Sequence, residues 1–260
     1  MNKLSVIGSG MLGVNQITRH GFSVIHTASK VFWIGEIAGL EHYLSDASIA
    51  HHNLSYLYEE GKRDTDNYIR IIAYLIREVN DCEHLCLVVP GHPQIGVTIV
   101  QQLQQLSQSG GFELFCFPGI SSFDAMINDI WLDPLEEGAS LLDANRLIIY
   151  DYMMEPCINY FIYHVCSIGN IKTDYLIPQK SNKVSYLKSK LLKHYQRTQQ
   201  IFLFSAATCD EEAPDKIEGT LSQLEDLLAH VTYRHSLYIP ASLPNKMRVN
   251  YEFLKEINIT

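Results

Sequence analysis

Apolar positions in the first half of the chain form short runs that alternate with stretches of helical spacing. The run Leu85–Val89 is continuously apolar, which is typical of a strand buried on both faces of a parallel sheet. The segment Asp64–Val79 carries apolar side chains three and four positions apart, which predicts an amphipathic helix. Further strands are expected at Leu4–Ile7, Val31–Ile34 (entered through Val24–Ser29) and Phe112–Phe117, and further helices near Gly13–Gly21 and Gly96–Ser107. This alternation predicts an α/β fold.

The second half of the chain has a less regular pattern. A basic amphipathic helix is expected at Lys183–Tyr195, because lysines alternate there with apolar residues at helical spacing. The other expected helices are Ser122–Ile130, Ile158–Ser167, Thr220–Leu228 and one from about Val249. The expected strands are Arg146–Tyr150, Asp174–Ile177, Gln200–Ser205 and Ser236–Ile239. Because Pro118 and Gly119 end the first series, we expect two α/β domains, residues 1–120 and residues 121–260.

Composition and charge exclude several classes of protein. Hydrophobic residues make up 47% of the 260 positions, which is enough for packed cores and argues against wholesale disorder. The net charge of −9 argues against binding to nucleic acid, which needs a basic surface. No apolar run reaches the length of about 20 residues that a membrane span requires. The chain starts with Met1, Asn2 and Lys3 and leads directly into a strand, so we expect no signal peptide and a cytoplasmic protein.

The six cysteines are scattered through apolar segments and are interpreted as small buried side chains. Only Cys82, His84 and Cys86 have a spacing that suggests metal binding. A structural zinc site needs about four converging ligands, and the sequence offers no second cluster to complete this one. We therefore expect no metal.

Three glycine-containing turns follow predicted strands. Gly8, Gly10 and Gly13 have the spacing of a dinucleotide-binding loop, but no acidic residue follows before Glu36, so a phosphate loop and a simple tight turn both remain open. The turns Pro90–Pro93 and Pro118–Ser122 each come directly after an apolar strand. Ligands of open α/β sheets bind at the carboxyl ends of strands, so these two turns are candidates for a binding site.

A polar aromatic cluster precedes the long predicted helix. Tyr56, Tyr58, Arg63 and Tyr68 lie within thirteen positions of one another. Each tyrosine alone is explained by packing in a core or an interface. Together, phenols and a guanidinium can also stabilise a developing negative charge and move a proton.

These motifs resemble those of the tetrapyrrole-methylase fold, the class III S-adenosylmethionine (SAM) methyltransferases. Within that superfamily the chain most resembles the split borosin peptide backbone α-N-methyltransferases, and the likeness spans nearly the whole chain. The matching segments are Gly8–Gly10, Gln16–Thr18, Tyr58, Arg63–Thr65 with Tyr68, Gly91–Pro93, Pro118–Ser121, Asp129–Pro134, Tyr238–Ala241 and Asn250–Tyr251. The resemblance implies two α/β domains of the tetrapyrrole methylase type with the cofactor cleft between them.

The resemblance also implies a cofactor, a mechanism and partners. SAM would bind and S-adenosyl-L-homocysteine would leave, with no metal. The implied cofactor contacts are Pro90, Gly91, His92, Ile95, Val97, Ser121, Ser122, His164, Ala206 and Ser236. The implied catalytic residues are Tyr58 as proton acceptor, Tyr68 as its orienting partner, Arg63 as the cation that lowers the pKa of a tyrosine, and Tyr56 nearby. The substrate would be a separate precursor peptide, bound by a homodimer as a heterotetramer with two peptides.

Some positions depart from the borosin pattern, and two other functions stay open. Pro90 stands where borosins have Tyr, His164 where they have Gln, and Arg63 precedes Tyr68 by five positions instead of four. One alternative is a methyltransferase of the same fold that acts on a small molecule such as a tetrapyrrole. The other is a catalytically silent protein that binds SAM or a peptide. The sequence ends at Thr260 directly after its last predicted helix, so we expect the substrate to be supplied by another chain.

Overall fold

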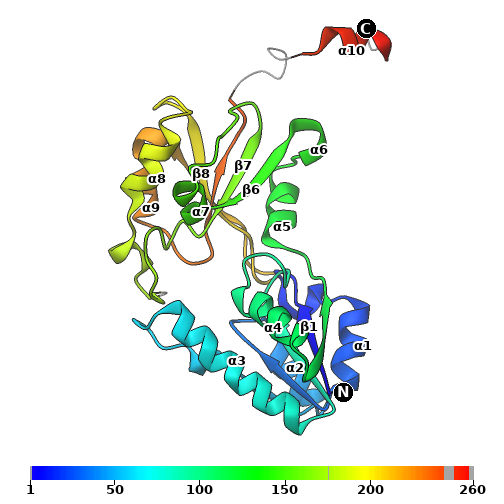
Figure 1. Ribbon diagram of the computed structural model, residues 1–260. Coiled ribbons are helices and arrows are strands. Elements are labelled where there is room, and N and C mark those ends of the chain that lie inside the picture. The colour runs from blue at the N-terminus through cyan, green and yellow to red at the C-terminus, as the bar shows by residue number, and fades with distance from the viewer. Residues whose placement is uncertain (1, 175, 243–248, 258–260) are drawn as a thin grey trace. The chain divides into compact units, whose positions relative to one another are not determined.

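The computed structural model describes residues 2–174, 176–242 and 249–257, which form two compact units (Figure 1). The first unit holds the residues up to Asp129, together with Ile171–Ile177 and Ser205–Asp215. The second unit holds Ile130–Asn170, Pro178–Phe204 and the residues from Lys216 onward. Each unit is built on a five-stranded sheet.

The first unit is a parallel sheet with helices on both faces. Its strands lie in the order β3-β2-β4-β1-β5, and all the neighbouring pairs are parallel. The strands are β1 (Asn2–Gly8), β2 (Lys30–Trp33), β3 (His51–Asn53), β4 (His84–Val89) and β5 (Phe112–Phe117). The helices are α1 (Arg19–Thr27), α2 (Leu40–Asp46), α3 (Asp64–Asp81), α4 (Thr98–Gln108) and α5 (Ser122–Asp129).

Alternate side chains of the central strands enter two different cores. Leu85 and Leu87 of β4 pack in the core that also contains apolar residues of α3 and α4. Cys86 and Val88 of the same strand point to the other face and pack with residues of α1 and α2. Because both faces of β4 are covered, its sequence is continuously apolar, as the hydrophobic pattern predicted.

Two expectations for the first unit are corrected. The helix expected at Gly13–Gly21 is a short 3-10 helix at Gly13–Gln16 followed by α1, which begins only at Arg19. The chain breaks between them because Ile17 and Thr18 are extended, and the Thr18 hydroxyl caps α1 by accepting from the Gly21 N–H at 2.9 Å. Helix α1 therefore includes most of the segment that was expected to lead into β2.

The second unit has a mixed sheet in the order β6-β7-β10-β8-β9. Strands β6 and β7 are parallel, whereas β10 is antiparallel to both β7 and β8. The strands are β6 (Ala139–Asp143), β7 (Asn159–Tyr163), β8 (Gln200–Ser205), β9 (Asp215–Thr220) and β10 (Ser236–Ile239). The helices are α6 (Pro134–Glu137), α7 (Ala144–Ile149), α8 (Val184–Leu191), α9 (Leu224–Leu228) and α10 (Tyr251–Glu256).

The two faces of this second sheet differ. Helices α7, α8 and α9 lie on the same side of β6, β7 and β8 (Figure 1), and their leucines share one apolar core with residues of the sheet. The opposite face carries stacked aromatic rings, in which Tyr238 lies between Phe161 at 4.9 Å and Phe202 at 5.8 Å. The sheet of the second unit thus has an apolar core on one face and stacked aromatic rings on the other, whereas the sheet of the first unit has a core on each face.

Three expectations for the second unit are wrong. Arg146–Tyr150 is largely helix α7 and not a strand, because the Asp143 carboxylate accepts from the Arg146 N–H at 2.8 Å and starts a helix. The range Ile158–Ser167 contains strand β7 in place of a helix. The described residues of Asp174–Ile177 form no strand of either sheet. The expected strands β8 and β10 and the basic helix α8 are confirmed.

Candidate functional site

The backbones of three strand ends meet at one edge of the first sheet. Strand β1 lies between β4 and β5, so their carboxyl ends are adjacent. A Cβ atom placed on Gly8 would lie 2.4 Å from the Gly91 carbonyl oxygen and 2.7 Å from the Gly119 nitrogen. Only glycine allows so close an approach. The structure therefore brings together the three turns that the sequence singled out, and we call these three residues the glycine junction.

The first of these turns is held by its own side chains. The carboxamide oxygen of Gln16 accepts from the N–H groups of Met11 at 2.7 Å and Leu12 at 3.0 Å. Gly13 has a φ of +61°, and a Cβ there would lie 2.2 Å from the Ala38 carbonyl oxygen. No α-helix opens at Gly13, so a dinucleotide-binding loop is not supported, and the segment is a tight turn.

The second turn, Pro90–Pro93, is joined to the first by two backbone hydrogen bonds. The Gly91 N–H donates to the Gly10 carbonyl at 2.9 Å, and the Gly10 N–H donates to the Gly91 carbonyl at 3.3 Å. The Nδ1 atom of His92 accepts from the Gln94 N–H at 3.1 Å, so a neutral His92 ring carries its proton on Nε2. Ile95 and Val97 follow at the start of α4, both half-buried.

The third turn ends in a capping box that begins α5. The Ser121 N–H donates to the Asp124 carboxylate at 2.7 Å, and the Ser121 hydroxyl accepts from the Asp124 N–H at 3.1 Å. The Ser121 hydroxyl also lies 2.7 Å from the same carboxylate. Ser121 is buried by this arrangement, and Ser122 is the first residue of the helix. Ser121 therefore fixes the direction in which α5 leaves the glycine junction.

Tyr58 and Tyr68 are brought together, but their electrostatic setting differs from expectation. Their rings pack edge to face with 6.2 Å between centroids, against the core beneath α3. Burial, with smaller effects from Tyr68 and the Asp64 carboxylate, raises the pKa of Tyr58. Burial and Asp64 also raise the pKa of Tyr68, and a hydrogen bond with Thr98 opposes this shift. The lowered tyrosine pKa that was expected from Arg63 is not present.

Arg63 and Tyr56 lie at the exposed rim of this segment. Arg63 is exposed and occupies the position before α3, with extended backbone angles of φ −65° and ψ 141°. Tyr56 is 58% exposed, and its ring lies 5.3 Å from that of His52. No hydrogen bond or ion pair in the described part of the chain joins the Arg63 side chain to Tyr58. Arg63 thus lies beside the tyrosine pair along the chain without a polar bond to Tyr58.

An aspartate–histidine pair occupies the carboxyl ends of β6 and β7 in the second unit. The Nδ1 atom of His164 lies 2.6 Å from the Asp143 carboxylate, and His164 has a φ of +57°. Burial acts to raise the pKa of Asp143, but the hydrogen bonds with His164 and the Arg146 N–H outweigh it, so the pKa is lowered. Asp143 was not among the residues expected at the site, although an aspartate directly before a helix is a recognisable N-cap.

The remaining expected cofactor contacts lie near strand ends. Ser236 is buried at the start of β10 opposite Phe204 of β8. Since Leu237 pairs with Ile162, Ser236 lies at the end of the sheet where β7 leads into His164. Ala206 is buried and follows β8 directly in sequence. His164 and Ser236 therefore share one edge of the second sheet.

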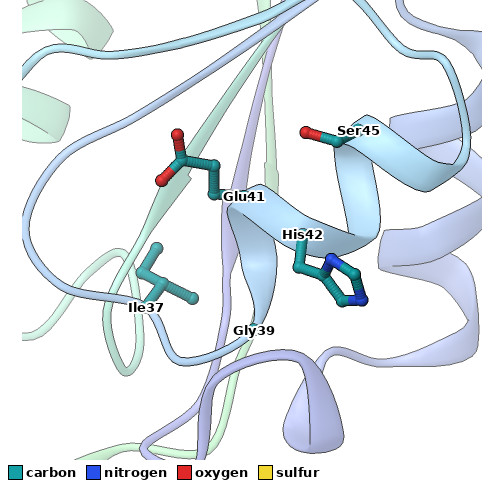
Figure 2. A pocket seen from close by; sticks show the side chains of 5 residues that line it. All are labelled: Ile37, Gly39, Glu41, His42 and Ser45. Atoms are coloured by element: carbon teal, nitrogen blue, oxygen red, sulfur yellow. The ribbon is translucent and has the colours of Figure 1, made fainter.

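A shallow pocket of about 520 Å³ lies on α2, away from these residues in sequence. Figure 2 shows Glu41, His42 and Ser45 projecting from α2, with Ile37 on the preceding loop. None of the residues expected at the functional site lines this pocket.

Two further features concern metals and membranes. Within residues 2–174, 176–242 and 249–257, no three His, Cys, Asp or Glu side chains are grouped as metal ligands. Of the residues considered for zinc, Cys86 is fully buried in β4 and His84 contacts the Ser5 hydroxyl at 2.9 Å. Over the same described residues, no helix has the length and apolarity needed to cross a bilayer.

Curated relatives of this chain are described both as methyltransferases and as precursors of ribosomally synthesized cyclic peptides. A methyltransferase and ribosomally synthesized type I borosin cyclic peptide precursor of Coprinopsis marcescibilis is 24% identical over 99% of this chain and 67% of its own length. The gymnopeptides precursor of Gymnopus fusipes, of the same kind, is 28% identical over 91% of this chain and 57% of its own length. The chain thus spans 57% to 67% of the length of these two relatives.

Solved structures show the same fold at low sequence identity. Uroporphyrin-III-C-methyltransferase from Thermus thermophilus matches with a TM-score of 0.62 and 15% identity, over 92% of both chains. A cobalt precorrin-4 methyltransferase of cobalamin biosynthesis matches with a TM-score of 0.60 and 12% identity, over 92% of this chain and 94% of the other.

These findings confirm the expected α/β fold with two sheets and the expected class of methyltransferase. The family model for Tetrapyrrole (Corrin/Porphyrin) Methylases matches residues 3–225, most of the chain. This protein therefore belongs to the tetrapyrrole methylase family.

Proposed function

We propose that this protein transfers methyl groups from SAM to backbone amide nitrogens of a peptide. The observation that carries the proposal is the match to borosin methyltransferase precursors over 91% to 99% of the chain. The tyrosine–arginine segment supports it, because it supplies the polar groups that amide methylation requires. Every residue role in the following paragraphs is part of this proposal.

The glycine junction and its neighbours fit SAM, a compact ligand with a positively charged sulfonium group and polar ends. At this edge Gly91 has a φ of +66°, and a Cβ placed there would be in van der Waals contact with the Met11 sulfur at 3.6 Å and the Ile120 carbonyl oxygen at 3.9 Å, so the position is bordered closely on both sides. When bound, SAM supplies an activated methyl group. The residues that would hold it are Pro90, Gly91, His92, Ile95, Val97, Ser121, Ser122, His164, Ala206 and Ser236.

An amide nitrogen is a poor nucleophile because its lone pair is delocalised into the carbonyl group. A catalyst must therefore stabilise negative charge on the carbonyl oxygen and accept the N–H proton. Hydrogen-bond donors aimed at the developing charge are usually the largest contribution to such catalysis. In this chain the donors are the Arg63 guanidinium and the phenol of Tyr68, with Tyr56 at the rim of the same segment.

Tyr58 is our candidate for the proton acceptor. To accept a proton it must first lose its own, so its pKa decides whether it can take that role. In the free protein the pKa of Tyr58 is raised, so its phenol is protonated at neutral pH. A phenolate would be favoured by a guanidinium within about 4–6 Å. Arg63 is exposed and free to change rotamer, so we infer that it turns towards Tyr58 when the peptide binds.

A methyltransferase acting on a small molecule is the second candidate. It is favoured by the fold match to tetrapyrrole methyltransferases and by Pro90, which departs from the borosin pattern. A silent binding protein is the third, and the raised pKa of Tyr58 is the observation in its favour.

Incubation of the purified protein with SAM and two probes separates the three candidates. The probes are the peptides encoded by short open reading frames beside its gene and uroporphyrinogen III. Methylation of a peptide supports the proposal, methylation of uroporphyrinogen alone favours the second candidate, and no methylation favours the third.

The partners are also proposals. We infer a homodimer that binds two separate precursor peptides, supported by exposed apolar side chains such as Ile149, Tyr150 and Met153 in the second unit. Light scattering at several concentrations tests this, and a constant mass near 29.6 kDa would contradict it.

Peptide mapping of the purified protein tests the separate substrate, because methylated residues in its own chain would contradict a substrate supplied in trans. A cytoplasmic location stays a prediction.

A further inference from the structure

We propose that Thr173, acting with Asn67, is a positioning residue that holds the Tyr58–Arg63 loop and Asp64 in the arrangement used for methyl transfer. The inference rests on the function proposed above. Thr173 lies more than one hundred positions after this loop in the chain, within Ile171–Ile177, which we call the strap. The strap belongs to the first unit although both of its neighbouring segments belong to the second.

The strap fixes the backbone on both sides of Arg63. The Thr173 N–H donates to the Lys62 carbonyl at 2.8 Å, and the Gly61 N–H donates to the Thr173 carbonyl at 2.8 Å. On the other side, the Asp64 N–H donates to the Ile171 carbonyl at 3.0 Å. Arg63 itself is in an isolated antiparallel bridge with Lys172. The strap therefore sets where the Arg63 side chain begins.

Asn67 fixes the other end of the loop, next to Tyr58. Its side chain is fully buried, and its carboxamide pairs with both backbone groups of Glu59. The Oδ1 atom accepts from the Glu59 N–H at 3.1 Å, and Nδ2 donates to the Glu59 carbonyl at 3.0 Å. The second proton on Nδ2 is donated to the Thr173 hydroxyl at 2.8 Å. Both donors and the acceptor of Asn67 are thus used.

The Thr173 hydroxyl connects this network to the tyrosine pair. It accepts from Asn67 and donates to the Asp64 carboxylate at 2.7 Å. Asp64 is the charge that acts on both Tyr58 and Tyr68. Thr173 is itself 92% buried, since only 8% of its surface is exposed. Loss of this one hydroxyl would leave a buried Asn67 donor without its acceptor and would release the Asp64 carboxylate.

Outside this network the loop is held from the surface, where Arg70 pairs with the Glu59 carboxylate at 2.6 Å and donates to the Leu57 carbonyl at 2.9 Å, and the Leu176 N–H lies 3.4 Å from the Glu60 carboxylate. Residues 59–63 are all exposed, and a Cβ placed on Gly61, with its φ of +76°, would meet nothing within 4 Å. The cores of the first unit, by contrast, include none of the strap residues that the structure describes. Removal of the Thr173 hydroxyl is therefore expected to loosen the loop while the unit stays folded. Such loosening harms a reaction that depends on placement within about 1 Å.

The test compares Thr173→Val with Thr173→Ser. Valine has the shape of threonine without the hydroxyl, whereas serine keeps the hydroxyl. Thr27→Val is the matched control, because the Thr27 hydroxyl donates only to the Val24 carbonyl within α1, at 3.0 Å. We expect Thr173→Val to lower kcat for the peptide by roughly 10- to 100-fold with an unchanged Kd for SAM. Thr173→Ser and Thr27→Val should stay close to the wild type.

Hydrogen exchange read by mass spectrometry supplies a second readout that does not depend on turnover. Thr173→Val should speed exchange in residues 59–68, and Thr173→Ser should not. If Thr173→Val does not fold, Thr173→Ala replaces it, because alanine removes the hydroxyl without putting a methyl group in its place.

The outcomes distinguish the positioning role from the proposed function. Equal kcat in the wild type and Thr173→Val would overturn the positioning role, and so would equal impairment of the valine and serine variants. A wild-type protein that methylates no peptide would instead refute the proposed function, and the catalytic role of Thr173 with it.

Discussion

The edges of the two sheets show two ways of building the end of a strand. In the first unit, three strand ends meet through backbone alone at Gly8, Gly91 and Gly119. In the second unit, the ends of β6 and β7 are joined by a side-chain hydrogen bond between the Asp143 carboxylate and His164. The first edge should therefore be sensitive to added volume, and the second to changes of charge.

The largest effect is expected from Gly119→Ala. The added Cβ would lie 2.4 Å from the Gly91 carbonyl oxygen and 2.7 Å from the Gly8 carbonyl carbon, so backbone must move. We expect affinity for SAM, measured by calorimetry, to fall by about 100-fold or more, equivalent to about 2.7 kcal/mol. Gly110→Ala is the control for backbone strain without a clash, because Gly110 has a φ of +90° but a Cβ there meets nothing within 4 Å. Unchanged SAM affinity in Gly119→Ala would remove the glycine junction from the cofactor site.

The next effect in size is expected from Tyr58→Phe, on turnover and not on SAM affinity. Loss of a general acid–base group costs about 10²–10⁴-fold in rate, whereas the ring packing against Tyr68 is kept. Stability should change by only about 1 kcal/mol, the net contribution of a typical hydrogen bond. Single-turnover kinetics at saturating SAM measures the rate. Tyr43→Phe is the control, because its hydroxyl contacts His26 at 2.7 Å on the surface of the same unit. A loss below about threefold would exclude Tyr58 from the mechanism.

A smaller effect is expected from Asp143→Asn in the second unit. Asparagine caps a helix as well as aspartate does, so α7 should keep its start while the charge facing His164 is lost. We expect SAM affinity to fall by about 3- to 10-fold, since charge-assisted hydrogen bonds are worth about twice neutral ones. Asp133→Asn is the control. It makes the same change at the aspartate that caps α6 by accepting from the Leu135 N–H, and it should leave SAM affinity unchanged. Equal affinities in both variants would contradict a role for this edge.

The smallest effect is on stability at high pH. Burial, with a smaller contribution from Glu137, raises the pKa of Tyr238 to about 12 from 10.0. The folded protein therefore favours the neutral phenol, so this contribution is complete below about pH 10 and is lost as the pH rises towards 12. We expect the urea midpoint to fall over this window. Tyr238→Phe should lessen the fall, and a fall of the same size in the variant would contradict the assignment.

The sequence predicted the first unit better than the second for a physical reason. Strand β4 is covered on both faces, so Leu85–Val89 is apolar throughout and identifies a parallel strand. Strand β7 is also apolar, but a short apolar run fits a strand and a buried helix equally well, and the segment was assigned to a helix. The apolar residues of α7 were assigned to a strand for the same reason.

The candidate site divides in a similar way. Turns that follow strands were found because glycine and proline mark them, and the register of β1, β4 and β5 brings them together. No glycine, proline or other sequence signal singled out Thr173 and Asn67. The two residues lie 106 positions apart in the chain, and only the fold shows that Thr173, directly before a predicted strand, supports the loop before α3.

The most direct test of the central claim is to locate the transferred methyl group. The protein is co-expressed with the peptides encoded by short open reading frames beside its gene, and each peptide is sequenced by tandem mass spectrometry. We expect added methyl groups on backbone amide nitrogens with the wild type, and their loss with Tyr58→Phe. Methyl groups on side chains only, or peptides left unmodified while uroporphyrinogen III is methylated, would contradict it.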